Sequence, residues 1–187
     1  GVNILEANEI ADRVIGFMKE SIKKSINRSC LIVTMNNSQR DLIDEEIRHR
    51  ASKTPEANTY ISKWEETMEP FIVKNLENVQ GDERDFIFVS TLFGPNKDGV
   101  TMQRFGPINH PKGHRRLNVL FTRAKEGVEL FTSLTPNTIK EGGEKGRQIF
   151  KNYLDYAVTQ RIETGTPNEK GTDSDFEDWV MEELEQL

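Results

Sequence analysis

The chain has 187 residues, of which 35% are hydrophobic and 30% are charged, and its formal net charge is −6. This length suffices for one domain with a substantial core, and no apolar run of membrane-spanning length or signal-peptide pattern is found. The single cysteine, Cys30, excludes an internal disulfide framework and favours a reducing, cytoplasmic location. Its place in an apolar run predicts a buried thiol.

The charge is unevenly distributed along the chain. Residues 97–125 contain seven lysines and arginines against one acidic residue, Asp98, although the whole chain is acidic. A basic segment in an acidic chain indicates a local anionic partner, either nucleotide phosphates or a nucleic-acid backbone. A solvated loop without a partner is the alternative.

The first predicted element is a helix. Asn3 and Glu6 have the spacing of a capping box, in which Glu6 reaches back to the start of the helix. One apolar face then continues at helical spacing through Ile10, Val14, Phe17, Met18 and Ile22. Because an α/β domain that opens on a helix lacks its first strand, we expect further polypeptide upstream.

Residues 30–34 form a short continuous apolar run, which predicts a strand buried on both faces of a parallel sheet. A polar turn follows at 35–40, and a second helix is predicted from Leu42 onward. This turn lies at the carboxyl end of the strand, where open α/β sheets bind ligands. Gln39 and Arg40 are therefore candidates for an anion site, with ordinary surface polarity as the alternative.

The remaining elements follow the same α/β pattern. A short helix is expected within 51–69, strands at 71–73 and 86–90, a helix and strand across 115–132, and a helix at 146–157. We expect one domain at 1–160, a linker at 161–174, and at 175–187 the first helix of a following domain or a tail. The predicted fold class is a three-layer α/β/α domain with a mostly parallel sheet.

The most informative stretch is the helix and strand at 115–132. Leu117, Leu120, Phe121 and Ala124 repeat at helical spacing, so Arg123 is expected to leave the flank of a helix held in the core. A guanidinium positioned in this way suits a phosphate clamp. The alternative role is an ion pair at the end of the helix.

Two kinds of site are not predicted. The printed sequence contains no GxxxxGK[ST] string, the phosphate-binding Walker loop, and its glycine-rich segments have the wrong spacing. His110 and His114 are four residues apart, but Pro111 and Gly113 argue against the helix that a metal site would need. We therefore assign no metal ligand.

Three loops, at 37–40, 75–85 and 115–123, are expected to lie at one edge of the sheet. Four segments in series carry a resemblance to a known family. Residues 33–43, 79–85 and 117–125 resemble motifs IV, V and VI of superfamily 1 helicases, and 3–7 is similar to the segment that follows motif III. Together they resemble the second RecA-like motor domain of that family, over about residues 3–133. Residues 93–114 and the last helix are similar to large bacterial helicase-like proteins that continue into an endonuclease-like domain.

The resemblance implies a role for each matching residue. Arg123 would be the arginine finger facing the γ-phosphate, Arg40 a second phosphate contact, and Glu83 a ligand of the nucleotide sugar. Gln80 and Gly81 would couple nucleotide state to the grip on the strand. Residues expected near the nucleic acid are Thr34, Asn75, Glu77, Arg115 and Arg116.

The expected function is that of one of the two RecA-like motor domains of a helicase. ATP with Mg2+ would be bound mainly by a missing N-terminal RecA-like domain of the same polypeptide, and single-stranded DNA or RNA would be the other partner. We expect the 187-residue chain alone neither to hydrolyse ATP nor to unwind duplexes at a meaningful rate. The alternative is a non-motor RecA-like module that binds nucleic acid or protein without ATP.

Overall fold

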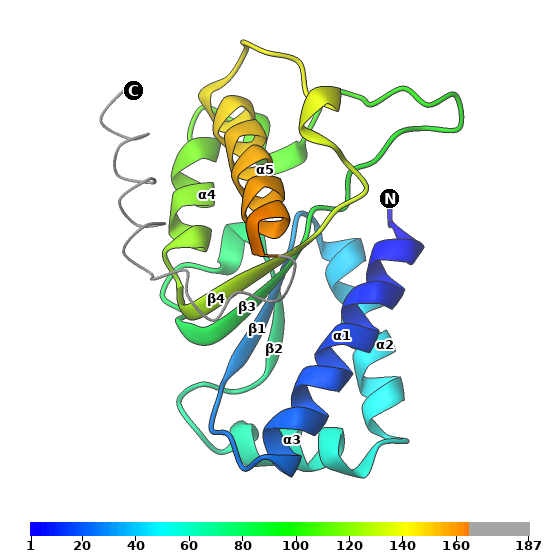
Figure 1. Ribbon diagram of the computed structural model, residues 1–187, viewed down its shortest axis with the longest axis vertical. Coiled ribbons are helices and arrows are strands. Elements are labelled where there is room, and N and C mark those ends of the chain that lie inside the picture. The colour runs from blue at the N-terminus through cyan, green and yellow to red at the C-terminus, as the bar shows by residue number, and fades with distance from the viewer. Residues whose placement is uncertain (165–187) are drawn as a thin grey trace.

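The fold packs helices against both faces of a β-sheet (Figure 1). The computed structural model describes residues 1–164. Its helices are α1 (Ile4–Lys23), α2 (Asn37–Ala51), α3 (Pro55–Glu65), α4 (Gly113–Phe121) and α5 (Lys145–Thr164). Its strands are β1 (Cys30–Thr34), β2 (Ile72–Asn75), β3 (Arg84–Ser90) and β4 (Ala124–Phe131). Short 3-10 turns occupy Leu76–Asn78, Gly106–Asn109 and Pro136–Thr138.

The four strands form one parallel sheet in the order β2-β1-β3-β4. Helices α1, α2 and α3 cover one face, and α4 and α5 cover the other (Figure 1). The predicted three-layer α/β/α architecture, consistent with a RecA-like fold, is confirmed. All carboxyl ends of the strands lie at one edge of the sheet and all amino ends at the other.

The sheet separates two hydrophobic cores, one on each face, because successive side chains along a strand point to opposite faces. In β1, Cys30 and Ile32 pack toward α1, α2 and α3, whereas Leu31 and Val33 pack toward α4 and α5. All five residues of β1 are buried, as expected for a strand covered on both faces. The prediction that Cys30 is a buried thiol is confirmed, and burial raises its pKa to about 12.

The second face depends on aromatic packing between α4 and α5. The rings of Phe121 and Tyr153 stack with centroids 3.4 Å apart, and the ring centroids of Phe105 and Phe150 lie 5.6 Å apart. Aromatic contacts of this kind add to the free energy gained from the buried apolar area. They fix the end of α4, which leads directly into β4.

Two local predictions are wrong in detail. Ala124 begins β4 and does not continue the helix, because α4 ends at Phe121 with Thr122 as its cap. Asn3 is the N-cap of α1 as predicted, and Glu6 does reach back, but to the side chain of Asn3, whose Nδ2 donates to Glu6 Oε1 at 3.1 Å, and not to its backbone N–H. The Asn3 side chain accepts from Glu6 N at 3.1 Å, while the Asn3 backbone N–H donates to Gln39 Oε1 at 2.8 Å.

The linker and the last helix expected from the sequence lie toward the carboxyl end of the chain. The linker expected at 161–174 begins within the last turn of α5 and otherwise lies outside the described residues, as does the helix expected at 175–187. Within residues 1–164, no helix combines the length and the apolar character that a membrane crossing requires.

Candidate functional site

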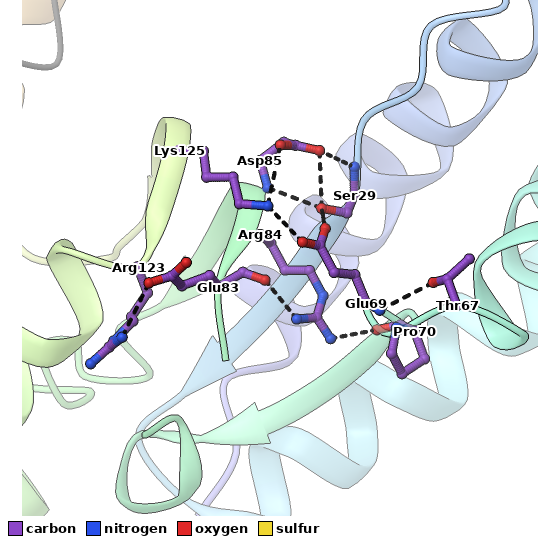
Figure 2. Close-up of polar contacts among 9 residues, drawn as sticks. All are labelled: Ser29, Thr67, Glu69, Pro70, Glu83, Arg84, Asp85, Arg123 and Lys125. Carbon is purple, nitrogen blue, oxygen red and sulfur yellow. Dashed lines mark hydrogen bonds and ion pairs between the residues drawn. The ribbon is translucent and has the colours of Figure 1, made fainter. Parts of the chain in front are cut away.

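The amino edge of the sheet brings together two of the predicted site residues. Glu83 immediately precedes β3 and Arg123 immediately precedes β4, and these strands are neighbours. Arg123 Nη1 lies 3.4 Å from Glu83 Oε1, with side-chain exposures of 28% and 57% (Figure 2). An ion pair this exposed contributes little to stability. Either residue can therefore leave this pair and bind a ligand at a low cost in free energy.

Gln80 and Gly81 lie on the loop that leads to Glu83, and both are exposed. Gly81 has a φ of 91°, a left-handed conformation that favours glycine. The turn is held by Asp82, whose N–H donates to Val79 O at 3.2 Å and whose carboxylate pairs with Lys74. The loop is thus shaped locally and presents its backbone to solvent.

Lys125 adds a third charge to the amino edge. Its Nζ lies 2.6 Å from Glu69 Oε1 and 4.0 Å from Asp85 Oδ1. The hydrogen bond to Glu69 raises the pKa of Lys125, although slight desolvation acts the other way. Desolvation acts to raise the pKa of Glu69, but the hydrogen bonds from Lys125 and Ser29 outweigh it and lower that pKa.

Arg40 does not join this edge. It lies in the first turn of α2, after the carboxyl end of β1, and binds Asp41 Oδ1 at 2.6 Å and Asn37 Oδ1 at 3.2 Å. At about 3.3 Å per residue, β3 alone separates the two edges by about 20 Å, well beyond the reach of two arginines to one phosphate. The expectation that Arg40 and Arg123 share one sheet edge is wrong.

The cause of this error is the path of the chain between strands. The loop from Asn75 to Asp85 starts at the carboxyl end of β2 and finishes at the amino end of β3. Helix α4 likewise runs back along the sheet and delivers Arg123 to the start of β4 (Figure 1). Each segment therefore contributes to both edges.

Two residues expected near nucleic acid are buried. Thr34 has no exposed surface, and its hydroxyl donates to Asn36 O at 2.8 Å. Asn75 is 5% exposed, and its Nδ2 donates to Asn37 Oδ1 at 2.5 Å. Neither side chain is open to direct contact with a strand, and their hydrogen bonds shape the start of α2. That these two residues lie near nucleic acid stays a prediction.

The other nucleic-acid candidates are more accessible. Arg115 and Glu77 are exposed, and Arg116 is half-buried. Arg116 Nη2 pairs with Glu77 Oε1 at 3.2 Å, and its Nη1 donates to Pro107 O at 3.3 Å. Since Glu77 follows the carboxyl end of β2, this pair places the first turn of α4 on the same side as Arg40.

A buried polar network at the carboxyl edge was not predicted. Glu6 is 4% exposed and accepts hydrogen bonds from Ser90 Oγ, Leu92 N and Ser133 N at 2.8 to 2.9 Å. Gln39 is fully buried and donates to Ser90 Oγ at 3.2 Å and to Asn3 O at 3.0 Å. The spacing of Asn3 and Glu6 indicated a cap, but nothing in it indicated these distant partners.

Burial sets the electrostatics of this network. Desolvation raises the pKa of Glu6, and the hydrogen bonds from Ser90, Leu92 and Ser133 offset part of the effect. Within residues 1–164, no cluster of three or more histidine, cysteine, aspartate or glutamate side chains is arranged to hold a metal ion. The cationic groups available to an anionic ligand include Arg123 and Lys125 at the amino edge and Arg40 and Arg115 at the carboxyl edge.

Comparison with known proteins places these features in a family. A family model described as an AAA domain matches residues 1–134. Over 136 residues the chain is 34% identical to a protein of Mycoplasma genitalium named an uncharacterized ATP-dependent helicase, an alignment that covers 69% of this chain and 11% of that protein. A homologue in Mycoplasma pneumoniae is 27% identical over 183 residues, which is 94% of this chain and 15% of that protein. The chain thus spans only a small part of the length of these relatives.

Proposed function

Because the chain belongs to the AAA domain family, we propose that it is a helicase-type motor domain, specifically the second RecA-like domain of an ATP-dependent superfamily 1 helicase. The names of the two mycoplasma relatives support ATP-dependent helicase activity in a longer polypeptide. In this proposal a preceding RecA-like domain binds most of the ATP and its Mg2+.

The observation that carries the proposal is the Arg123–Glu83 pair at the amino edge. Arg123 is positioned by the short link between α4 and β4, and within the described residues its buried Nε has no hydrogen-bond partner. A guanidinium with an unused donor and an exchangeable carboxylate partner fits a phosphate ligand. Arg123 would then act as the arginine finger, and the released Glu83 would bind the nucleotide sugar.

The loop before Glu83 would transmit the state of this site. Gln80 and Gly81 lie in the chain between the 3-10 turn at Leu76–Asn78 and Glu83, which pairs with Arg123. A shift of Glu83 on hydrolysis would move this loop, and with it Glu77 and its partner Arg116. We propose this coupling as the step that links ATP turnover to the grip on a strand.

The carboxyl edge would hold single-stranded DNA or RNA. Arg40, Arg115 and Arg116 lie on this side, and arginines that neutralise backbone phosphates supply sequence-independent affinity. We therefore assign Arg40 to a nucleic-acid phosphate in place of the nucleotide. The buried Thr34 and Asn75 would not contact the strand themselves but would fix this surface, because their hydrogen bonds to Asn36 and Asn37 position the start of α2.

The test is Arg123→Ala in the intact polypeptide. An arginine finger is worth about 10³–10⁵ in turnover, so ATP hydrolysis should collapse while binding of a fluorescent ATP analogue largely survives. Arg48→Ala is the matched control, because Arg48 forms an exposed ion pair with Asp44 on α2. Unchanged hydrolysis in Arg123→Ala would contradict the assignment.

Two further outcomes separate the proposal from its rival. The 187-residue chain alone should show ATP turnover close to the uncatalysed background, because it would carry half of the site. If the intact polypeptide binds single strands but neither binds nor hydrolyses ATP, a non-motor nucleic-acid-binding module is the better description.

A further inference from the structure

The first residue of β3, Arg84, is a buried arginine at the amino edge. It is 3% exposed, its Nη1 donates to Glu83 O at 2.6 Å, and its Nη2 donates to Pro70 O at 2.9 Å (Figure 2). Within the described residues its Nε has no hydrogen-bond partner. Burying a guanidinium is costly even with two carbonyl partners and the charge of Glu69 nearby, whose pKa Arg84 helps to lower, so stability alone is a poor explanation for this residue.

Arg84 contacts both Glu83 and Arg123, the two residues proposed to bind the nucleotide. Its side chain fixes the carbonyl of Glu83, and its backbone N–H donates to the carbonyl of Arg123 at 3.1 Å. The side chains of these two residues form their own ion pair, with Arg123 Nη1 lying 3.4 Å from Glu83 Oε1. One residue therefore sets the relative position of two backbones that come from distant parts of the chain.

The neighbouring strands are irregular at this point. Arg84 pairs with Ala124, but Phe86 pairs with Gly127, so β4 has one residue more than β3 between these contacts. Such β-bulges redirect side chains and are over-represented beside active sites. Here the bulge includes Lys125, whose Nζ reaches Glu69 and approaches Asp85.

The bulge is anchored to the rest of the amino edge. Ser29 lies just before β1, and its hydroxyl donates to Glu69 Oε2 at 2.5 Å. Its backbone N–H donates to Asp85 Oδ2 at 2.7 Å, and its Oγ accepts from Asp85 N at 3.0 Å. Ser29 is fully buried, so these bonds lie in an environment where they are not readily replaced by water. Figure 2 shows the resulting chain of contacts from Ser29 through Glu69 and Asp85 to Lys125.

We propose that Arg84 is a positioning residue for ATP hydrolysis, which holds the backbones of Glu83 and Arg123 in register while their side chains exchange partners. The inference rests on the proposed role of Arg123. The exposed Glu83–Arg123 pair supplies the exchangeable contact, and the buried Arg84 supplies the fixed one. A residue that acts in this way should affect the transition state more than the binding of ATP.

The experiment compares Arg84→Met and Arg84→Lys in the intact polypeptide, with Arg48→Met as the exposed control. Methionine fills space but donates no hydrogen bond, so kcat should fall about tenfold to a hundredfold while KM for ATP changes by less than about twofold. Lysine can still donate to one carbonyl, so Arg84→Lys should recover part of the loss. Thermal unfolding is measured for every variant.

A double-mutant cycle with Arg123→Ala then identifies the route of the effect. If Arg84 acts through Arg123, the double variant Arg84→Lys with Arg123→Ala should hydrolyse ATP no more slowly than Arg123→Ala alone. Additive losses would overturn the positioning role, as would an unchanged kcat in a folded Arg84→Met. If Arg84→Met does not fold, Arg84→Lys decides, and failure of both to fold shows a purely structural residue. Normal hydrolysis in Arg123→Ala would instead refute the proposed function itself.

Discussion

Partly exposed ion pairs at the amino edge of the sheet contrast with a buried polar network at its carboxyl edge. At the amino edge, the Glu83–Arg123 and Lys125–Glu69 pairs are partly exposed, with their charges at or near the surface. At the carboxyl edge, Glu6 and Gln39 are buried, and their hydrogen bonds are made within the fold. Exposed pairs can be exchanged for a ligand, whereas the buried network cannot be opened without destabilising the domain.

This difference indicates which polar residues to associate with function. A solvent-exposed ion pair contributes at most about 1 kcal/mol, so its members are free to change partners during a reaction cycle. An unsatisfied buried donor costs about 1–3 kcal/mol, so the carboxyl-edge network is expected to stay closed. In the proposed function, nucleic acid would then contact the accessible arginines of the carboxyl edge, not this network.

The largest effect on stability is expected from Glu6→Leu. The change leaves the N–H groups of Leu92 and Ser133 without their acceptor, so the free energy of unfolding should fall by about 3 kcal/mol. Urea denaturation followed by circular dichroism measures the loss. Glu9→Leu, at an exposed position on the same helix, is the control and should change stability by less than about 0.5 kcal/mol. Equal behaviour of the two variants would show that the buried network is not stabilising.

A smaller effect, on single-strand binding but not on ATP binding, is expected from a change at the carboxyl edge. Arg40→Ala in the intact polypeptide should weaken single-strand binding several-fold and reduce the slope of log affinity against log salt by about 0.7, the value for one lost phosphate contact. ATP binding in the absence of a strand should not change. Fluorescence anisotropy over a salt series measures the slope, with Arg48→Ala as the control. A loss of ATP binding in Arg40→Ala would place Arg40 at the nucleotide after all.

The smallest expected effect is a pH dependence. The pKa of Glu6 is raised above its ordinary value of 4.5 in the folded chain, so its protonated form favours folding. This contribution is fully present below pH 4.5 and is lost as pH rises through the folded pKa. The unfolding free energy of the wild type should therefore fall relative to that of Glu6→Gln as pH rises above 4.5.

Chemical denaturation of both proteins over a pH series measures this difference, and the other carboxyl groups largely cancel between them. Glu9→Gln serves as the control and should show no such trend. A difference that grows in favour of the wild type as pH rises would mean that the hydrogen bonds to Glu6 outweigh its burial.

Much of the fold follows from local patterns in the sequence. The continuous apolar run at 30–34 and the matching run at 86–90 predicted central parallel strands, and the helical spacing from Ile10 to Ile22 predicted α1. These patterns are informative because a strand covered on both faces and a helix covered on one face each require a particular spacing of apolar residues. The amphipathic spacing before Arg123 likewise predicted a helix that leads into a strand.

The placement of polar residues depended on the tertiary structure. The sequence alone determined the parallel α/β architecture and the closeness of Arg123 to a helix end. Only the tertiary structure decided that Arg40 lies at the opposite edge, that Asn75 is buried, and that Glu6 binds residues more than 80 positions away. Apolar periodicity is a local property of the chain, whereas the edge that a loop reaches depends on how the whole sheet is connected.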